Sequence, residues 1–248
     1  MRKARVAMTP RNWLLKTRLA NGAVVCGKNR AGYGGRGIYI FRDALEPELQ
    51  HLEKFLDPQG VFLDIGANTG IYTIKAAKFF TGKGGVVIAL EPFPDVLATL
   101  YHNVLTNGFT NVRLRSFCAG ECAQAVTFWM NFNRPASFSL VRRDEKALYL
   151  STLVVPVDNM FAWEGLNRLD YLKIDAEGAE AQVLAGAKET ISKYRPIIQV
   201  EVNINDAQID LPNYSVFQAA TGSANKVYIP NESLKIDVPT QLGWNKIN

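Results

Sequence analysis

The chain has 248 residues, of which 48% are hydrophobic and 21% charged, a balance typical of a globular protein and not of a disordered or fibrous one. No apolar run reaches the length of about 18–20 residues that a membrane-spanning helix needs, and the basic start of the chain does not lead into the apolar stretch of a secretory signal. The three cysteines are an odd and sparse set that argues against a disulfide framework. We therefore expect a cytoplasmic protein.

The net charge of +5 hides a strong asymmetry along the chain. Residues 1–42 contain ten Lys and Arg and no Asp or Glu, so the rest of the chain has more acids than bases. A segment of one sign attracts polyanions such as nucleic acid, anionic lipid or phosphorylated glycan, but it can also dock on an acidic surface of its own protein. Both interpretations stay open, and the first adds a peripheral position at an anionic surface to the expected location.

The first 58 residues predict a short α/β extension. Thr9-Pro10 is typical of a helix start and Asn21-Gly22 of a helix end, so we expect a helix between them. Two short strands, 23–26 and 37–41, are expected on either side of a Gly-rich turn. The apolar spacing in 47–55 then predicts a helix.

From Val61 onward the pattern becomes that of a doubly wound α/β domain. Four short apolar runs are continuous, as in strands covered on both faces. They alternate with helical patterns over 72–80, 95–105 and 179–194, an order that implies a parallel sheet with helices on both faces. The four runs cover 61–65, 86–90, 171–174 and 197–200.

Further apolar runs extend this sheet. Those over 112–117, 126–131 and 150–157 predict one more core strand and a β insertion, and those over 214–219 and 226–229 predict an antiparallel C-terminal hairpin at the sheet edge. We expect one domain over 1–248, with the basic extension in 1–58 and a catalytic core in 59–248.

Ligands on such sheets bind beyond the carboxyl ends of the strands, and the first strand ends in Asp64. Gly66 and Gly70 flank the turn that follows, and Gly66 would let a ligand approach the backbone. The spacing differs from the G-x-G-x-x-G of a dinucleotide site. A carboxylate at this turn disfavours a pyrophosphate and suits the ammonium group of an amino-acid ligand. The alternative is a plain strand-to-helix turn in which Asp64 caps backbone amides.

An acidic residue, Glu91, ends the second strand and precedes Pro92. A carboxylate there can accept hydrogen bonds from both hydroxyls of a ribose. The alternative, a surface glutamate, is disfavoured because the residue ends a buried run.

The segment around Asp175 places several charges at the end of another strand. Lys173 and Asp175 are two residues apart on a strand and share a face, and a cation in an apolar run is usually paired or functional. Asp175 is its expected partner. Glu177 and Glu180 fall in the first turn of the next helix, where acids favour the helix dipole.

The segments FLDIGANTGIYT, ALEPFP and YLKIDAEGAEAQVLAGA resemble the FkbM-type family of S-adenosylmethionine-dependent methyltransferases, over a stretch from Glu46 to Val202. The resemblance implies a seven-stranded, Rossmann-like class I sheet and O-methylation with S-adenosyl-L-methionine, which leaves S-adenosyl-L-homocysteine. In that pattern the methionine portion lies against Asp64, Gly66, Ala67, Asn68 and Gly70, the ribose against Glu91 and Pro92, the adenine against Cys118 and Ala119, and the transferring methyl group against Asp175. One departure is that no acid follows the third strand before Glu121.

The proton of an acceptor hydroxyl needs a general base. Asp175, oriented by Lys173, is our first candidate, and Glu177 and Glu201 are the others; the two histidines, His51 and His102, lie in helical stretches and are not expected to serve. No metal site is assigned, although oxygen ligands from Asp158, Asp175 and Glu201 are an alternative.

The acceptor is expected to be a hydroxyl of a small molecule or a glycan-type compound such as a glycolipid. The chain lacks the Asp/Asn-Pro-Pro-aromatic motif of many N-methyltransferases. The basic first 42 residues leave an RNA 2′-O-methyltransferase as a less favoured alternative. A non-catalytic interaction module that binds S-adenosylmethionine is the other alternative.

Overall fold

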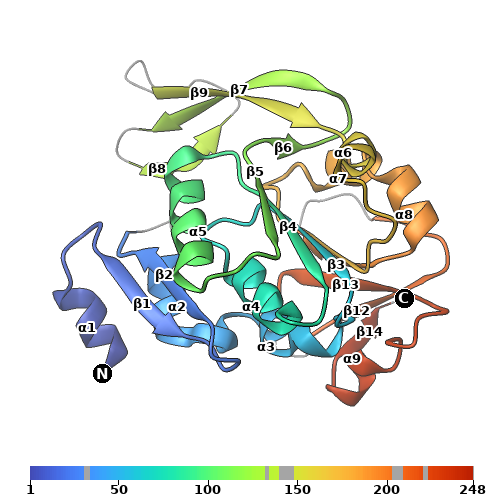
Figure 1. Ribbon diagram of the computed structural model, residues 1–248, viewed down its shortest axis with the longest axis horizontal. Coiled ribbons are helices and arrows are strands. Elements are labelled where there is room, and N and C mark those ends of the chain that lie inside the picture. The colour runs from blue at the N-terminus through green and yellow to red at the C-terminus, as the bar shows by residue number, and fades with distance from the viewer. Residues whose placement is uncertain (31–33, 132–133, 140–147, 203–208, 220–222, 248) are drawn as a thin grey trace.

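The computed structural model describes residues 1–30, 34–131, 134–139, 148–202, 209–219 and 223–247 (Figure 1). Its main sheet has the strand order β14-β12-β13-β11-β10-β3-β4-β5. The parallel part consists of β11 (Ile197–Glu201), β10 (Tyr171–Ile174), β3 (Val61–Ile65), β4 (Val86–Leu90) and β5 (Val112–Arg115). The four predicted core strands are confirmed, and the fold is the doubly wound α/β sheet of class I.

Antiparallel strands extend this sheet beyond β11. The predicted hairpin is confirmed as β12 (Tyr214–Gln218) and β13 (Asn225–Pro230), with β13 paired to β11. A short strand, β14 (Asn245–Ile247), follows helix α9 (Val238–Gln241) and pairs with β12. The sheet therefore has eight described strands rather than the expected seven, and the predicted turn at 221–222 lies outside the described residues.

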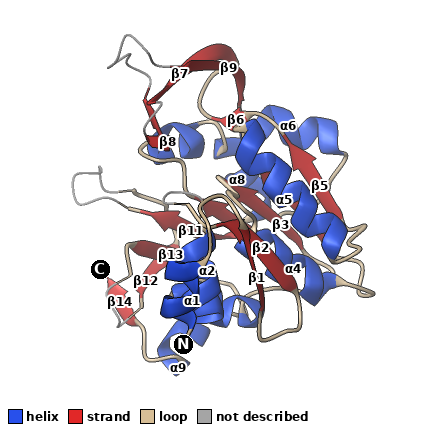
Figure 2. Cartoon of the chain, turned by 90° about the vertical axis from the view of Figure 1, so that its left-hand side faces the viewer, coloured by secondary structure: helices blue, strands red, loops and turns tan. Residues whose placement is uncertain are grey.

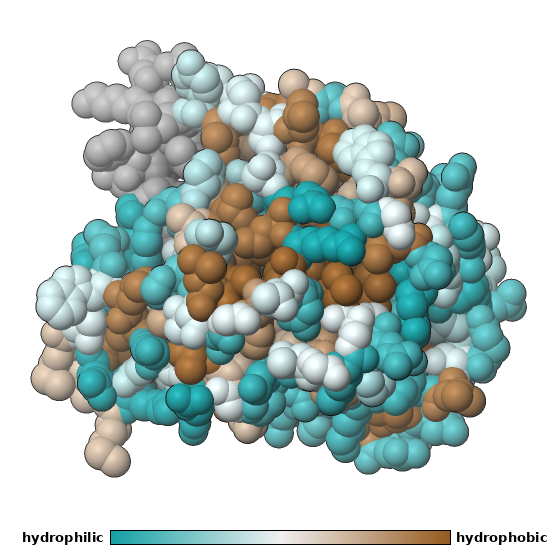
Figure 3. Space-filling view, viewed as in Figure 1, coloured by the Kyte–Doolittle hydropathy of each residue, from teal (hydrophilic) through white to brown (hydrophobic). Residues whose placement is uncertain are grey.

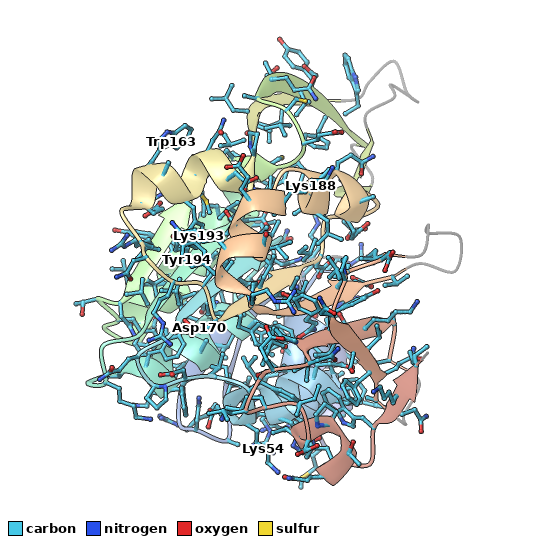
Figure 4. All side chains as sticks on the ribbon, turned by 90° about the vertical axis from the view of Figure 1, so that its right-hand side faces the viewer. Lys54, Trp163, Asp170, Lys188, Lys193 and Tyr194 are labelled. Carbon is cyan, nitrogen blue, oxygen red and sulfur yellow. The ribbon has the colours of Figure 1, made fainter. Side chains whose placement is uncertain are left out.

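Helices cover both faces of the parallel strands. Helices α4 (Ile71–Phe80) and α5 (Pro94–Thr106) share one apolar core with Phe62. Helices α6 (Val157–Glu164), α7 (Glu180–Ala185) and α8 (Lys188–Tyr194) share the other with Leu63, and this face is the one seen in Figure 4. Because successive side chains of β3 point to opposite faces, one strand supplies both cores.

Two helices stand where one was predicted over 179–194. A β-carbon added at Gly186 would lie 2.0 Å from the carbonyl oxygen of Gly120. The chain therefore approaches another backbone closely at Gly186, between α7 and α8. A helical periodicity contains no sign of this tertiary contact.

The first 58 residues differ most from expectation. The predicted helix over 9–21 is wrong: helix α1 (Arg2–Met8) precedes a hairpin of β1 (Leu14–Arg18) and β2 (Val24–Lys28). Gly22 has φ +88° in the hairpin turn, so Asn21-Gly22 connects two strands. Burial alternates along β1, which is the two-residue period of a strand.

The predicted strand over 37–41 is also wrong, because these residues belong to helix α2 (Gly35–Phe41). A β-carbon at Gly35 would lie 2.4 Å from the Lys28 carbonyl oxygen, so this helix start packs directly on β2. Tertiary packing overrides the strand-like composition. The 3-10 turn η1 (Arg42–Leu45) follows, then α3 (Pro47–His51) and η2 (Leu52–Lys54), which correspond to the predicted helix. Gly32, expected in the turn before α2, lies outside the described residues.

A second sheet projects beyond the main one, above it in Figure 2. Its strand order is β6-β9-β7-β8. The predicted insertion strands are confirmed as β7 (Gln124–Asn131) and β9 (Leu148–Val155), whereas β6 (Cys118–Ala119), β8 (Arg134–Ser139) and helix α6 were not predicted.

Candidate functional site

The carboxyl ends of β3, β4, β10 and β11 meet at one rim of the main sheet. The register pairs Lys173 with Asp64 and Ile174 with Val200. Asp175 and Glu201, which follow the last two residues, therefore end adjacent parallel strands. The sequence predicted this convergence, and the structure brings the predicted acids of three strands together here.

The turn after β3 is fixed by contacts with both neighbouring strands. The amides of Gly66 and Ala67 both donate to the carbonyl oxygen of Leu90, at 3.1 and 2.9 Å. Gly66 has φ +73°, and an added β-carbon would lie 1.8 Å from the Asp175 carbonyl oxygen. We expected a ligand to approach Gly66, but on this side it is the backbone of Asp175 that does so.

Glu91 connects two loops of the rim. Its carboxylate accepts hydrogen bonds from the amides of Asn68, at 2.9 Å, and Phe93, at 3.0 Å. Burial raises the pKa of Glu91 to about 7, although the two amide donors oppose this shift. Glu91 is thus not the surface glutamate of the alternative interpretation. Pro92 beside it is half-buried and Asn68 is exposed.

A buried cluster of one cation and two carboxylates lies under the rim. The Lys173 ammonium is 3.1 Å from an Asp175 carboxylate oxygen and 4.0 Å from one of Asp64. Burial alone would lower the pKa of Lys173, but Asp175, Asp64 and Glu46 together raise it above its ordinary value. The cation is therefore kept charged, as the predicted Lys173–Asp175 pair requires.

Asp64 is completely buried. The Thr73 hydroxyl donates to one of its oxygens at 2.6 Å, while the other, Oδ1, has no hydrogen-bond partner within the described part of the chain. Burial raises the pKa of Asp64, and Lys173 opposes this. Because Asp64 is completely buried, it has no exposed surface for the ammonium group of a ligand to contact, and Lys173 lies between it and Asp175.

Asp175 and Glu201 form a carboxyl pair at the end of β10 and β11. Glu201 donates a hydrogen bond to Asp175, and this bond, together with burial, raises the pKa of Glu201 to about 8. Burial would raise the pKa of Asp175, but the Lys173 charge and the bond from Glu201 lower it. Glu201 is therefore the more basic member of the pair and Asp175 the more acidic one.

The two acids after Asp175 have different roles. The Glu180 carboxylate is buried and accepts hydrogen bonds from the amides of Ala176 and Gly178, so it fixes the turn between β10 and α7. Glu177 is exposed and has φ +52°, a conformation that is uncommon outside glycine and is found at functional sites.

The residues after β5 lie next to Glu91. Burial and the Glu91 charge raise the pKa of the Cys118 thiol to about 12, and the adjacent Ala119 is buried. The rings of Phe93 and Phe128 meet edge to face, with their centroids 5.4 Å apart. The second sheet thereby touches the loop that carries Glu91, a contact that the sequence did not predict.

A cavity of about 600 Å³ opens beside the carboxyl pair. Its walls come from three parts of the chain: Glu46 and His51 in the stretch 44–51, Asp175 and Glu201 at the rim, and Asn225 and Trp244 in the C-terminal part. Sequence reasoning missed Glu46, and it set aside His51, which does line the cavity. Burial, followed by Lys54 and Lys75, lowers the pKa of His51. Nothing in the local pattern of 44–51 marks these residues as cavity walls.

A hydrogen-bonded chain links Glu46 to the interior of the sheet. The Tyr72 hydroxyl donates to Glu46 at 2.6 Å, the Gln199 amide donates to Tyr72 at 2.9 Å, and the Tyr171 hydroxyl donates to Gln199 at 2.9 Å. The Tyr72 ring also faces the Lys173 ammonium, 5.0 Å from its centroid. The cavity wall is thus held by the same buried polar side chains that surround Lys173.

The alternative of a metal shared by Asp158, Asp175 and Glu201 is wrong. The Asp158 carboxylate accepts hydrogen bonds from the amides of Glu189 and Thr190, at 3.1 and 2.8 Å, and so caps α8. Within the described ranges, no group of three or more His, Cys, Asp or Glu side chains could hold a metal ion. Nor is any helix there long and apolar enough to span a membrane.

The doubly wound sheet and the acids along its rim define a methyltransferase of the class I, Rossmann-like type. A model of the methyltransferase FkbM domain matches residues 64–218, more than half of the chain. The protein therefore belongs to the FkbM methyltransferase family, as the sequence motifs indicated.

Two curated proteins from a fungus and a bacterium are similar to this chain. Methyltransferase 1 of Beauveria bassiana (strain ARSEF 2860) is 26% identical over 217 residues, which cover 75% of this chain and 85% of the relative. The 31-O-demethyl-FK506 methyltransferase FkbM of Streptomyces tacrolimicus is 24% identical over 219 residues, which cover 76% and 81%.

Solved structures that this chain matches include methyltransferase FkbM from Methylobacillus flagellatus KT, with a TM-score of 0.49 and 19% identity. The match covers 79% of this chain and 53% of that one, so the present chain spans about half of its length. An rRNA methylase from Streptococcus thermophilus has a TM-score of 0.41 and 10% identity, with 72% and 90% covered.

Proposed function

We propose that this methyltransferase takes its methyl group from S-adenosylmethionine and transfers it to a hydroxyl oxygen of an acceptor bound in the cavity beside Asp175 and Glu201. The proposal takes residues 1–248 as one catalytic unit. The observation that carries it is the carboxyl pair, which lies both at the strand ends and in the cavity wall. A donor at the rim and an acceptor in the cavity would meet at this pair.

The donor side is supported by Glu91 and the loops around it. Each Glu91 oxygen accepts one amide hydrogen bond and keeps a lone pair that a ribose hydroxyl can use. Cys118 and Ala119 would border the adenine in this arrangement. When bound, S-adenosylmethionine supplies an electrophilic methyl group on a sulfonium.

The acceptor side needs a group that takes the hydroxyl proton, and a base is most efficient when its pKa lies near the working pH. Glu201, with a pKa of about 8, meets this condition better than Asp175, whose pKa is lowered. We therefore assign the proton to Glu201. In the form that acts as the base Glu201 has lost its proton; the proton it takes from the acceptor hydroxyl is then held in the hydrogen bond to Asp175. Lys173 keeps Asp175 in its charged form.

The chemistry of the acceptor follows from the cavity wall and from one relative. The carboxyl groups of Glu46 and Asp175 line the cavity beside Glu201, and two carboxylates there would repel the phosphates of an RNA chain. The printed name of the Streptomyces tacrolimicus relative specifies a methyl group on oxygen. A neutral molecule bearing hydroxyl groups, such as a glycan-type compound, suits this wall better than a polyanion.

The test combines a binding and a transfer measurement. Calorimetry should show S-adenosylmethionine and S-adenosylhomocysteine binding to the wild type, and Glu91→Ala should weaken both. Label from methyl-labelled donor should then appear on a hydroxyl-bearing acceptor, and Glu201→Gln should slow transfer about 10²- to 10⁴-fold. Glu189→Gln, an exposed change on α8, is the control. Absence of donor binding, or affinity that Glu91→Ala leaves unchanged, would disprove the proposal.

A further inference from the structure

The basic first segment of the chain presents cations that the rest of the protein does not neutralise. Five exposed Lys and Arg side chains within residues 1–18 form no ion pair with any carboxylate in the described part of the chain. They are Lys3, Arg5, Arg11, Lys16 and Arg18. These five side chains therefore do not dock on the acidic core of the protein. Their charges face solvent.

Large apolar side chains are exposed in the same stretch. Met8 at the end of α1 is 79% exposed, and Trp13 and Leu14 at the start of β1 are 64% and 47% exposed. Pale and brown residues accordingly lie among hydrophilic ones at the left-hand end of Figure 3, over α1 and β1. Exposing a tryptophan and two other apolar side chains to water beside basic residues is unfavourable, and such a surface typically marks a place where a partner binds.

The turn from Met8 to Leu14, which we call the α1–β1 turn, is held firmly from behind. The Asn29 side-chain amide donates to the carbonyl oxygens of Val6, at 3.0 Å, and Thr9, at 2.7 Å. The Asn29 backbone amide donates to Trp13 at 2.8 Å. The exposed side chains thus project from a fixed backbone, so their exposure does not follow from a loose chain end.

The α1–β1 turn lies at the same end of the molecule as the site. Leu14 pairs with Lys28 across the hairpin, and Lys28 forms an ion pair with Asp95. Asp95 belongs to the first turn of α5, only a few residues after Glu91. A surface that touched this turn would therefore lie near the mouth of the site.

We propose that the α1–β1 turn docks the protein on an anionic lipid membrane. Tryptophan favours the boundary between water and lipid, and aliphatic side chains gain free energy when they enter it. Lys and Arg beside them add attraction to anionic headgroups. Nucleic acid would satisfy the cations but offers no comparable place for Met8 and Leu14. This inference is independent of methyl transfer and is tested without measuring activity.

The experiment is co-sedimentation of the full chain with vesicles. Wild type should pellet with vesicles of phosphatidylcholine mixed with phosphatidylglycerol, should bind phosphatidylcholine vesicles much more weakly, and should be released by salt. Arg5→Gln and Arg11→Gln should each lower the partition coefficient about fivefold, and Trp13→Ala about tenfold.

Matched controls come from the opposite side of the molecule, where Figure 4 shows Trp163 on α6 and Lys188 and Lys193 on α8. Trp163 is 67% exposed, close to Trp13. Trp163→Ala, Lys188→Gln and Lys193→Gln should leave partitioning unchanged, and thermal unfolding should show that every variant is folded. Failure of the wild type to pellet, equal binding to both vesicle types, or equal losses in the control variants would overturn the proposal. The proposal would also be overturned if the protein did not bind vesicles but bound RNA, and if the Arg variants weakened that RNA binding.

Discussion

Gly66 and Asp175 approach so closely that a β-carbon on Gly66 would lie 1.8 Å from the Asp175 carbonyl oxygen. The amide of Asp175 in turn donates to Ile65 at 3.1 Å. The turn after β3 and the end of β10 are thus in direct backbone contact. The position of the Asp175 carboxylate depends on a residue that has no side chain.

Gly66→Ala should therefore damage both the fold and the site. A β-carbon at a positive φ costs about 1–2 kcal/mol, and overpacking against Asp175 adds about 1–3 kcal/mol. Gly82→Ala is the matched control, because Gly82 has the same φ of +73° but no atom within 4 Å of an added β-carbon. Chemical denaturation should show a clearly larger loss for Gly66→Ala, and calorimetry should show loss of donor binding in that variant alone. Equal losses in the two variants would mean that the Asp175 contact is unimportant.

The carboxyl pair predicts the pH dependence of catalysis. Because the pKa of Glu201 is about 8, the fraction of Glu201 in its deprotonated form increases as pH rises. We therefore expect kcat/KM to rise about tenfold per pH unit below that value and to level off above it. Glu201→Gln should be slow and should lack this rise. The pKa of His51 is lowered below its ordinary value of 6.5. A profile that instead levels off below pH 6.5, and that His51→Asn abolishes, would assign the base to His51.

Removing the buried cation should destabilise the protein strongly. Lys173→Met leaves the charges of Asp64 and Asp175 without their partner, a change that typically costs about 3–5 kcal/mol. Adding Asp64→Asn should recover part of the loss, because one of the uncompensated carboxylates is then gone. The control Lys188→Met changes an exposed lysine and should stay within about 0.5 kcal/mol. Denaturant titration measures all three, and a small effect of Lys173→Met would contradict the pairing.

Glu91 predicts a pH dependence of stability. Its pKa is raised from 4.5 to about 7 in the folded protein, so the folded state holds this proton more tightly than the unfolded chain. The contribution of Glu91 to the free energy of unfolding is therefore full below pH 4.5 and is lost as pH rises toward 7, by about 3 kcal/mol.

Comparison of the wild type with Glu91→Gln isolates this contribution, because other carboxyl groups titrate in both. The difference between their free energies of unfolding should change steadily between pH 4.5 and pH 7. Glu121→Gln, an exposed change nearby, is the control: its free energy of unfolding should differ from that of the wild type by a constant amount over this pH range. A constant difference for Glu91→Gln would show that Glu91 titrates alike in both states.

The core strands could be predicted because each is buried on both faces and is therefore a near-continuous run of apolar residues. The run over 61–65 is buried at every position, and it ends where the sequence changes to Gly66. The acids at the strand ends were predicted for the same reason, since parallel strands bring their carboxyl ends to one rim.

The basic extension could not be predicted in the same way. In 9–21 the signals for a helix start and a helix end were real local preferences, but the chain uses Asn21-Gly22 as a hairpin turn. In 37–41 a strand-like composition forms a helix because Gly35 packs against Lys28. Both outcomes depend on tertiary contacts. The walls of the cavity depend on them too, since Tyr72 and Asn225 both donate to the Glu46 carboxylate.

The composition of the cavity also bears on how this enzyme could change its acceptor. The residues proposed to hold the donor lie within the stretch 64–218 that matches the family model. Most residues that line the cavity lie outside that stretch, in 44–51 before it and at 219 and 223–244 after it. Under the proposed function, donor and acceptor recognition would thus be encoded in separable pieces of one gene. Exchanging those two flanking pieces between family members offers a route to new acceptors that leaves the methyl donor's binding residues intact.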